Sequence, residues 1–413
     1  MDQIKIRQNA VRRYLAGESV TTICQDLGVS RKWFYKWYNR HQAGAENWYE
    51  DQSKAPKRCP HKINSAVEKL VLNIRDNLEN TKYAQIGAMA IAWQIQKLGG
   101  TPPPLWSINR ILKRNDRIKQ KTERAKNKSN VNYPYFTEAF YPGHIHQADL
   151  VGPRYLKGDG RFYCFSTIDR FSHQAYSVPL RSKDDDSIIY ALIKTWKVIG
   201  VPKLLQFDNE LSFLGSNRYP HSFGKVLKLC LSVGIQPIFI PQGEPWRNGV
   251  IEHFNRTFES NFYRTEQFKN FKHLQEQLEV FLNYHNENHV YSANHGKTPN
   301  QILDSQEIKP SKLSDKFEFY QDQTLPYESY IHFVRFIRSD LKLRIRGESF
   351  LMPKETMYQY LRATIYTEYH KLNVFNENKL VAKLDYPLPN FNQENPVELI
   401  KTLAKLIDKF FKM

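Results

Sequence analysis

Three acidic residues stand in local settings that suit metal-dependent chemistry. Asp149 ends the apolar part of HIHQADL, Asp208 ends that of KLLQFDN, and Glu252 lies near the start of a predicted amphipathic helix in NGVIEHFNRTFE. Three carboxylates around two divalent ions are what phosphoryl transfer on a nucleic-acid backbone requires. Carboxylate oxygens suit Mg²⁺ or Mn²⁺. We therefore expect two such ions, with Asp149 bridging both, Asp208 binding one and Glu252 binding the other.

Other acids near these three fit structural roles better. Asp169 suits a turn cap or a structural ion pair, Asp159 belongs to a hairpin turn, and Glu210 could support Asp208 from two residues away. Three further acids at 184–186 precede a predicted helix, and the helix dipole favours negative charge at that end. We therefore expect these three to cap the helix and not to act in catalysis.

Histidine and cysteine patterns are better explained without a zinc site. His144 and His146 share one face of a predicted strand. Because no cysteine lies nearby, packing or substrate contact is favoured over metal binding for this pair. The four cysteines are too far apart for a zinc knuckle, and we expect reduced, partly buried thiols at Cys24, Cys59, Cys164 and Cys230.

The elements that must position the acids form a predicted α/β unit. Three strands come first, in HIHQADL, RFYCFSTID and HQAYSVPL, with a two-strand turn at GDG 158–160. Alternating helices and strands follow, at Ser187–Ile199, 203–207, Phe223–Val233 and Ile235–Ile240. In such units the active residues lie at the carboxyl ends of strands, which is where the first two acids fall.

The third acid follows a segment with little regular structure. The loop QGEPWRNG at 242–249 is expected to be irregular and mobile, because Gly243, Pro245 and Gly249 interrupt it. Asn248 can cap the helix that carries Glu252. Another helix, at about Phe271–Asn286, is expected to continue the packing.

Residues 1–42 are predicted to form a helix-turn-helix domain. Three short helices lie within 5–40, with Ser19 and Ser30 as caps and Gly28 in the turn. Polar residues at the start of the third helix would meet base edges, and its basic residues would meet phosphates. The predicted DNA contacts are Arg31, Lys32, Lys36 and Arg40. The alternative is a three-helix bundle with a basic exterior, and the turn favours DNA binding over it.

A second helix-turn-helix domain is predicted at 63–118. Its helices are expected at Ile63–Leu78, Ile86–Leu98 and Ser107–Arg114, and the last of them offers further DNA contacts at Arg110, Lys113 and Arg114. Linkers are expected at 43–62, which is polar, and at 119–140, which begins with the basic run KQKTERAKNKSN. That run suits a flexible tether that follows phosphates.

Short alternating runs return near the C-terminus and predict a small β-barrel at 320–390. Lys342, Arg344 and Arg346 alternate on one strand face, where they could contact phosphate. Residues 391–413 are predicted to hold a basic, amphipathic helix.

Length and charge point to a multidomain protein with a nucleic-acid partner. The 413 residues favour two to four domains. The formal net charge is +18, and residues 1–130 hold 25 Lys and Arg against 11 Asp and Glu. A concentrated basic region is expected of a protein that binds nucleic acid. A solvated basic surface or association with an anionic membrane face is the alternative.

A membrane protein or a secreted one is not expected. No apolar run approaches the roughly 18 residues that a spanning helix requires. The N-terminal segment MDQIKIRQNAVRRYL lacks the apolar stretch of a secretory signal. We therefore expect a cytoplasmic protein with no membrane partner.

At the three acidic motifs the chain resembles the DDE transposases of bacterial insertion sequences, whose catalytic core is of retroviral-integrase type. The resemblance is carried by HQADLVGP at Asp149, QFDNELSF at Asp208 and PQGEPWRNGVIEHFNRTFE at Glu252. It implies an RNase H-like core at 141–305, with these three acids as catalytic metal ligands. It also implies that Asn248 and Arg256 contact DNA beside the third acid.

The chain departs from such relatives in three ways. There are 43 residues between Asp208 and Glu252, more than is usual, and GSNRYPHS at 215–222 is the expected place of the extra length. The segment after Tyr284 has Asn286 and Asn288 where relatives often have an arginine. The zinc-binding domain of retroviral integrases is absent, and helix-turn-helix units replace it.

The resemblance implies a transposase that cuts double-stranded DNA at the ends of a mobile element and joins the 3′-hydroxyls to target DNA. Such a protein would act as a homo-oligomer on DNA, in the cytoplasm and associated with the nucleoid. Two alternatives stay open. One is a catalytically inactive, domesticated DNA-binding regulator, and the other is a nuclease with an RNase H-like core that cuts without joining.

Overall fold

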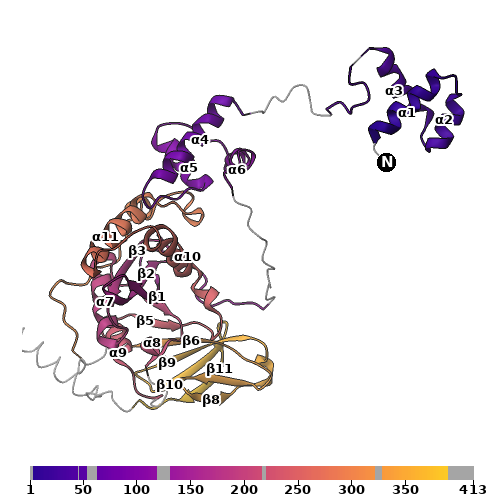
Figure 1. Cartoon of the computed structure of the whole chain (residues 1–413). Coiled ribbons are helices and arrows are strands. Elements are labelled where there is room, and N and C mark those ends of the chain that lie inside the picture. Colours follow the sequence, from indigo (N-terminus) through magenta and orange to yellow (C-terminus); the bar gives the residue numbers. More distant parts are fainter. Residues whose placement is uncertain are drawn as a thin grey trace, which may run out of the picture. The chain divides into compact units, whose positions relative to one another are not determined.

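The computed structural model describes residues 3–44, 46–53, 63–118, 131–215, 220–320 and 328–388. The chain divides into two compact units, Met1–Asn64 and Ser65–Met413, and Figure 1 shows the elements of each. The boundaries predicted for smaller domains stay predictions. Within the described ranges, no helix is both long enough and apolar enough to cross a membrane.

The N-terminal unit contains the three helices expected from the sequence. They are α1 (Gln3–Leu15), α2 (Val20–Leu27) and α3 (Arg31–Gln42). The hydroxyls of Ser19 and Ser30 accept hydrogen bonds from the first turns of α2 and α3, as predicted. Gly28 has φ 62°, a left-handed conformation that glycine adopts at little cost. Phe34 of α3 is fully buried and centres the small core.

Part of the predicted linker at 43–62 packs on this unit. The guanidinium of Arg7 donates to the backbone oxygen of Tyr49 and to the carboxylate of Asp51, both at 2.7 Å. The ring of Trp48 meets that of His41 edge to face. The described residues 46–53 therefore belong to the packed unit, and 54–62 lie outside the described residues.

The second unit begins with α4 (Ser65–Asn80), α5 (Ala88–Lys97) and α6 (Leu105–Arg114), which confirm the three helices predicted there. Val71, Ile91 and Ile108 are fully buried between them. The loop between α4 and α5 packs on the rest of the unit. The ring of Tyr83 in this loop lies edge to face with that of Phe281, with the ring centres 5.4 Å apart. The basic run at 119–130 lies outside the described residues.

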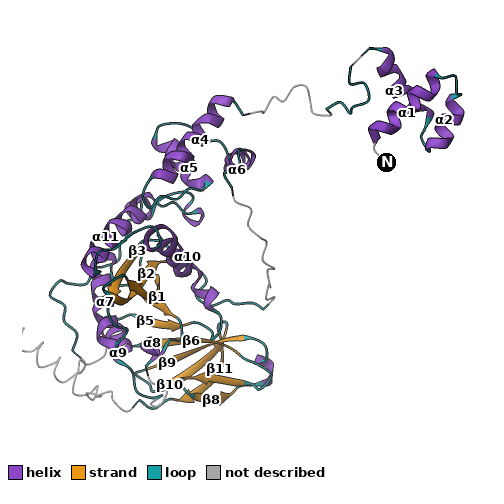
Figure 2. Cartoon of the chain, viewed as in Figure 1, coloured by secondary structure: helices purple, strands orange, loops and turns teal. Residues whose placement is uncertain are grey.

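A nine-stranded sheet follows, in the order β11-β10-β9-β6-β5-β4-β1-β2-β3 (Figure 2). Its first strands confirm the predicted pattern, since β1, β2 and β3 are antiparallel whereas β4 and β5 run parallel to β1. Their bounds are β1 (Ile145–Leu156), β2 (Gly160–Asp169), β3 (Ala175–Leu180), β4 (Leu204–Phe207) and β5 (Gln236–Phe239).

Helices bury both faces of these strands. Alternate residues of β2 point to opposite faces, so Tyr163 and Phe165 join a core with α7 and α9, whereas Phe162 and Cys164 join one with α10 and α11. The helices are α7 (Asp185–Ile199), α8 (Leu211–Leu214), α9 (Lys225–Ser232), α10 (Gly249–Phe258), α11 (Phe271–Asn288) and α12 (Pro299–Asp304). Three short 3-10 helices are η1 (Pro245–Asn248), η3 (Ser292–Asn294) and η4 (Lys354–Thr356), and a π-helix, η2 (Glu259–Tyr263), follows α10.

The C-terminal strands are present, but the predicted small barrel at 320–390 is not confirmed. They are β6 (Tyr330–Phe336), β7 (Lys342–Ile345), β8 (Glu348–Leu351), β9 (Tyr360–Tyr366), β10 (Lys371–Asn376) and β11 (Lys379–Asp385). β6 pairs with β5, and β9, β10 and β11 continue the same sheet, while β7 and β8 form a separate hairpin. No closed sheet occurs among the described strands. The helix predicted at 391–413 lies outside the described residues.

Candidate active site

Two of the predicted acids stand at matching positions of neighbouring strands. β1 and β4 are parallel, with Gln147 opposite Gln206. Because side chains alternate along a strand, Asp149 and Asp208, each two residues further on, project to the same face as the glutamines. Asp149 lies within β1, and Asp208 directly follows β4.

Asp149 is half-buried and held by two hydrogen bonds. Its Oδ1 accepts from the backbone N–H of Leu150 at 2.9 Å, and its Oδ2 accepts from Nδ2 of Asn255 at 2.7 Å. Burial raises the pKa of Asp149 to about 6, and the negative charges of Asp208 and Glu252 add to the rise. The charges of Asp208 and Glu252 therefore both act on Asp149.

Asp208 has a similar but simpler environment. Its Oδ1 accepts from the backbone N–H of Glu210 at 3.0 Å, and burial raises the pKa of its carboxyl. The side chain of Glu210 turns away to form an ion pair with Lys183 at 2.9 Å. Glu210 thus supports Asp208 through its backbone.

Glu252 lies in the first turn of α10, half-buried. The three carboxylates offer only hard oxygen atoms and negative charge, so they fit Mg²⁺ or Mn²⁺ by donor type. Within the described part of the chain, no three His, Cys, Asp or Glu residues form a group that could hold a metal ion. The structure therefore brings the acids into electrostatic contact without arranging them as a finished metal site.

The N-terminus of α10 is bonded to the strands that carry the other two acids. Oε1 of Gln147 accepts from the backbone N–H of Ile251 at 3.0 Å, while its Nε2 donates to the backbone oxygen of Arg247 at 3.2 Å. Nε2 of Gln206 donates to the same oxygen at 3.0 Å and to Oδ1 of Asn248 at 2.7 Å. The sequence analysis missed both glutamines, although each lies two residues before an acid.

Asn248 precedes α10 but its side chain makes no capping hydrogen bond. The predicted side-chain cap is therefore wrong. The reason is that Gln147, a strand residue, accepts from an N–H of the first turn that has no partner within the helix. The side-chain oxygen of Asn248 instead accepts a hydrogen bond from Gln206. Asn248 is also 4% exposed, so its predicted contact with DNA would need the turn to open.

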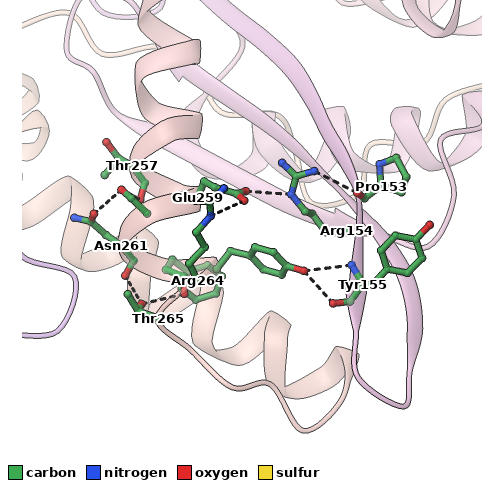
Figure 3. A network of polar contacts seen from close by, with 11 residues as sticks. Pro153, Arg154, Tyr155, Thr257, Glu259, Asn261, Arg264 and Thr265 are labelled. Carbon is green, nitrogen blue, oxygen red and sulfur yellow. Dashed lines mark hydrogen bonds and ion pairs between the residues drawn. The ribbon is translucent and has the colours of Figure 1, made fainter. Parts of the chain in front are cut away.

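The π-helix η2, which directly follows α10, is bonded to β1 as well. Figure 3 shows Arg154 of β1 donating to Glu259 at 3.1 Å, with Arg264 donating to the same carboxylate at 3.2 Å. The hydroxyl of Tyr263 accepts from the backbone N–H of Tyr155 and donates to its oxygen, at 3.3 and 2.9 Å. These contacts hold η2, and with it the end of α10, along β1.

The loop at 242–249, predicted to be irregular and mobile, contains the 3-10 turn η1, and the side chain of Arg247 links it to further parts of the second unit. The guanidinium of Arg247 donates to Glu244 at 3.0 Å and to the hydroxyl of Tyr360 at 3.2 Å, and it lies 3.7 Å from the ring centre of Tyr133. Tyr133 belongs to the segment before the core, and Tyr360 belongs to β9. The loop is thus attached to two distant parts of the second unit.

The DNA contacts predicted on α3 differ in how free their side chains are. Lys32 and Lys36 are exposed, and Lys36 lies 4.7 Å from the ring centre of Trp37. Arg31 donates to the hydroxyl of Thr21 at 2.7 Å. Arg40 donates to the backbone oxygen of Glu50 at 3.1 Å and is half-buried, so it also has a structural role.

The contacts predicted in the second unit show the same division. Arg110 and Lys113 of α6 are exposed, and Arg114, also exposed, forms an ion pair with Glu68 at 2.5 Å. Arg256 is exposed on α10, one helical turn beyond Glu252. Arg346 is only 3% exposed and its burial lowers the pKa of its guanidinium, so the sequence-based suggestion of a phosphate contact there is wrong.

Several residues that the sequence suggested as structural are placed accordingly. Asp169 accepts from the N–H and the hydroxyl of Ser172 at 2.9 and 2.6 Å, which makes it a turn cap. Asp184 caps α7 through the N–H of Ser187 at 2.8 Å. His146 is fully buried, and burial lowers its pKa, so it packs as a neutral ring.

Comparisons with known proteins bear on both units. Residues 1–49 match the family model of a homeodomain-like domain, and residues 233–299 match that of an integrase core domain. The second match includes Glu252 but not the other two acids. No curated protein matches the chain.

Two solved structures illustrate the structural likeness. The catalytic core domain of HTLV-2 integrase in complex with magnesium is 21% identical, with a TM-score of 0.30 over 39% of this chain and 96% of that one. The integrase intasome of simian T-cell lymphotropic virus, in complex with a PP2A regulatory subunit, is 15% identical, with a TM-score of 0.37 over 73% and 93%. The two family matches confirm the resemblance to DDE transposases with an integrase-like core.

Proposed function

We propose that this protein is a transposase that binds the ends of a mobile DNA element and catalyses metal-dependent DNA cleavage and strand transfer. The observation that carries the proposal is the placement of Asp149 and Asp208 at matching positions of neighbouring parallel strands, with the start of the helix that carries Glu252 hydrogen-bonded to both strands. The integrase core domain match and the homeodomain-like domain match support it.

Asp149, Asp208 and Glu252 would hold two Mg²⁺ or Mn²⁺ ions. When bound, such ions activate the attacking water or 3′-hydroxyl and stabilise the leaving oxygen. The chain itself keeps the acids in place, because Asn255 orients Asp149 and the glutamines fix the start of α10.

Exposed basic residues would bind the DNA substrate. Lys32 and Lys36 of α3, Arg110 and Lys113 of α6, and Arg256 beside Glu252 would bind phosphates of double-stranded DNA. We further propose that the protein works as a homo-oligomer that holds two ends, in the cytoplasm and associated with the nucleoid.

Asp149→Asn tests the proposal. Duplexes from the DNA on either side of the gene are incubated with the full chain and Mg²⁺ or Mn²⁺, and binding, cleavage and joining are measured separately. We expect the variant to bind these duplexes like the parent and to lose cleavage and joining. Asp186→Asn, at an exposed acid paired with Lys225 away from the site, should retain all three activities.

Three outcomes would replace the proposal. Full cleavage by the Asp149→Asn variant would remove the acids from catalysis. Tight binding by the parent without cleavage in either metal would favour a catalytically inactive DNA-binding regulator. Cleavage by the parent without joined products from precut ends would favour a nuclease.

A further inference from the structure

Two buried glutamines occupy equivalent positions relative to two of the acids. Gln147 is 1% exposed and Gln206 is 4% exposed, and they are register partners on β1 and β4. A buried side-chain amide needs hydrogen-bond partners, since leaving a buried polar group unpaired is destabilising. Both glutamines find partners in the same short segment, the turn from Arg247 to Ile251.

The bonds converge on one turn of backbone. The oxygen of Arg247 accepts from both glutamines, at 3.2 and 3.0 Å. Gln147 also accepts from the N–H of Ile251, at 3.0 Å, and Gln206 also donates to Asn248, at 2.7 Å. The start of the turn is therefore hydrogen-bonded to both strands, and its end is hydrogen-bonded to β1.

Glu252 is the residue directly after Ile251. Its position relative to Asp149 is set through a short path, which runs from Asp149 along two residues of β1 to Gln147 and across one hydrogen bond to α10. The path to Asp208 is longer, because Gln206 bonds to Asn248, which lies four residues before Glu252. The glutamines lie close to the acids in the chain, and their side-chain amides bond to the turn.

We propose that Gln147 and Gln206 are positioning residues that hold Glu252 in place against Asp149 and Asp208. This proposal rests on the proposed function for its effect on catalysis. Its structural part, the fixing of the turn by the two glutamines, stands independently. Residues that orient metal-binding side chains typically change metal affinity or activity by about 10–100-fold when they are replaced.

Gln147→Met and Gln206→Met remove the bonds with little change in side-chain volume. The matched control is Gln236→Met, since Gln236 lies on β5 of the same sheet and bonds to His332 at 3.0 Å, away from α10. All variants are made in the full chain. Thermal unfolding is recorded first, so that a general loss of folding is recognised.

Two readouts need no catalysis. Hydrogen exchange of the amides from 247 to 255 should become faster in both glutamine variants and stay unchanged in the control. Calorimetry with Mn²⁺ alone should show dissociation constants raised about 10–100-fold in both. With plasmid DNA and Mn²⁺, we expect the maximal nicking rate to fall by a similar factor while the DNA concentration at half-maximal rate stays constant.

The outcomes separate the two proposals. Unchanged exchange and unchanged Mn²⁺ affinity in both glutamine variants would overturn the positioning role. Global unfolding of both, with a folded control, would overturn it too, because the glutamines would then serve the whole fold. If the parent protein neither binds Mn²⁺ nor nicks DNA, the proposed function fails, and hydrogen exchange alone decides whether the glutamines hold the turn.

Discussion

The side-chain amide of Asn255 donates a 2.7 Å hydrogen bond to Oδ2 of Asp149. Asn255 lies three residues after Glu252 on α10, so both side chains fall on the same face of the helix. One helix therefore carries the third acid and also orients the first. Oδ1 of Asn255 is buried without a hydrogen-bond partner among the described residues, which leaves the side chain dependent on its bond to Asp149.

Asn255→Ala should slow DNA cleavage by about 10–100-fold, because Asp149 loses the donor that orients one of its oxygens. DNA binding should be unchanged. Thr257→Val is the control, since the hydroxyl of Thr257 donates within α10, to the backbone oxygen of His253. Single-turnover cleavage rates of the two variants compare the effects. Equal rates for the parent and the Asn255 variant would show that this hydrogen bond does not matter for the chemistry.

Lys36→Ala should weaken DNA binding and lower the slope of log affinity against log salt by about 1, since one phosphate contact is lost. Lys36 is exposed on α3 and its ammonium lies over the ring of Trp37. Fluorescence anisotropy over a range of salt concentrations measures the slope. Lys5→Ala, at an exposed lysine of α1, should leave the slope as it is. A slope that Lys36→Ala does not change would remove α3 from the interface.

Arg247→Met should loosen the loop at 242–249, because the side chain loses its bonds to Glu244 and Tyr360 and its contact with the ring of Tyr133. Hydrogen bonds to charged groups contribute about 1.5–3 kcal/mol each. We expect the free energy of unfolding to fall by at least the contribution of one such bond, about 1.5–3 kcal/mol. Amide hydrogen exchange in the loop should become faster.

Arg264→Met is the matched control for this arginine. Its side chain is 72% exposed and pairs with Glu259, which keeps Arg154. Exposed ion pairs contribute about 0–1 kcal/mol. If both variants lose the same stability, Arg247 has no special role in anchoring the loop.

His289 should make stability depend on pH below neutrality. It is fully buried, Nε2 donates to the backbone oxygen of Tyr83 at 2.8 Å, and Nδ1 faces Nδ1 of His285 at 3.0 Å. Burial lowers the pKa of His289 to about 4, and the charge of His253 adds to the fall. The unfolded chain takes up the proton near pH 6.5, so the stabilisation is complete above that pH and is lost as the pH falls toward 4.

Urea unfolding at about pH 7 and about pH 5 measures this effect. A single such group contributes at most about 1.4 kcal/mol per pH unit. His289→Gln keeps a donor for Tyr83 and should flatten the dependence. It should not abolish it, because burial also lowers the pKa of His173, to about 4. A dependence as steep as that of the parent would show that His289 does not titrate in this window.

Local chemistry was sufficient to predict most of the elements. Ser19, Gly28 and Ser30 mark helix ends through interactions within a few residues, and each was found where the sequence placed it. Asp184 caps α7 for the same reason. The strands around Asp149 and Asp208 were predicted from alternation and turn residues, which are also local properties.

The tertiary structure alone decided which distant groups meet. The contacts of Gln147 with Ile251 and of Asn255 with Asp149 join positions on a strand and a helix that only packing brings together. The sequence also gave no sign that β6 pairs with β5 and does not start a separate barrel. The reason is that the backbone groups at the edge of a strand can pair with any other strand. The sequence by itself determined the types of the catalytic candidates and the elements that carry them. The packing of α10 across the strands decided how those side chains are held, because it depends on how apolar surfaces far apart in the chain fit together.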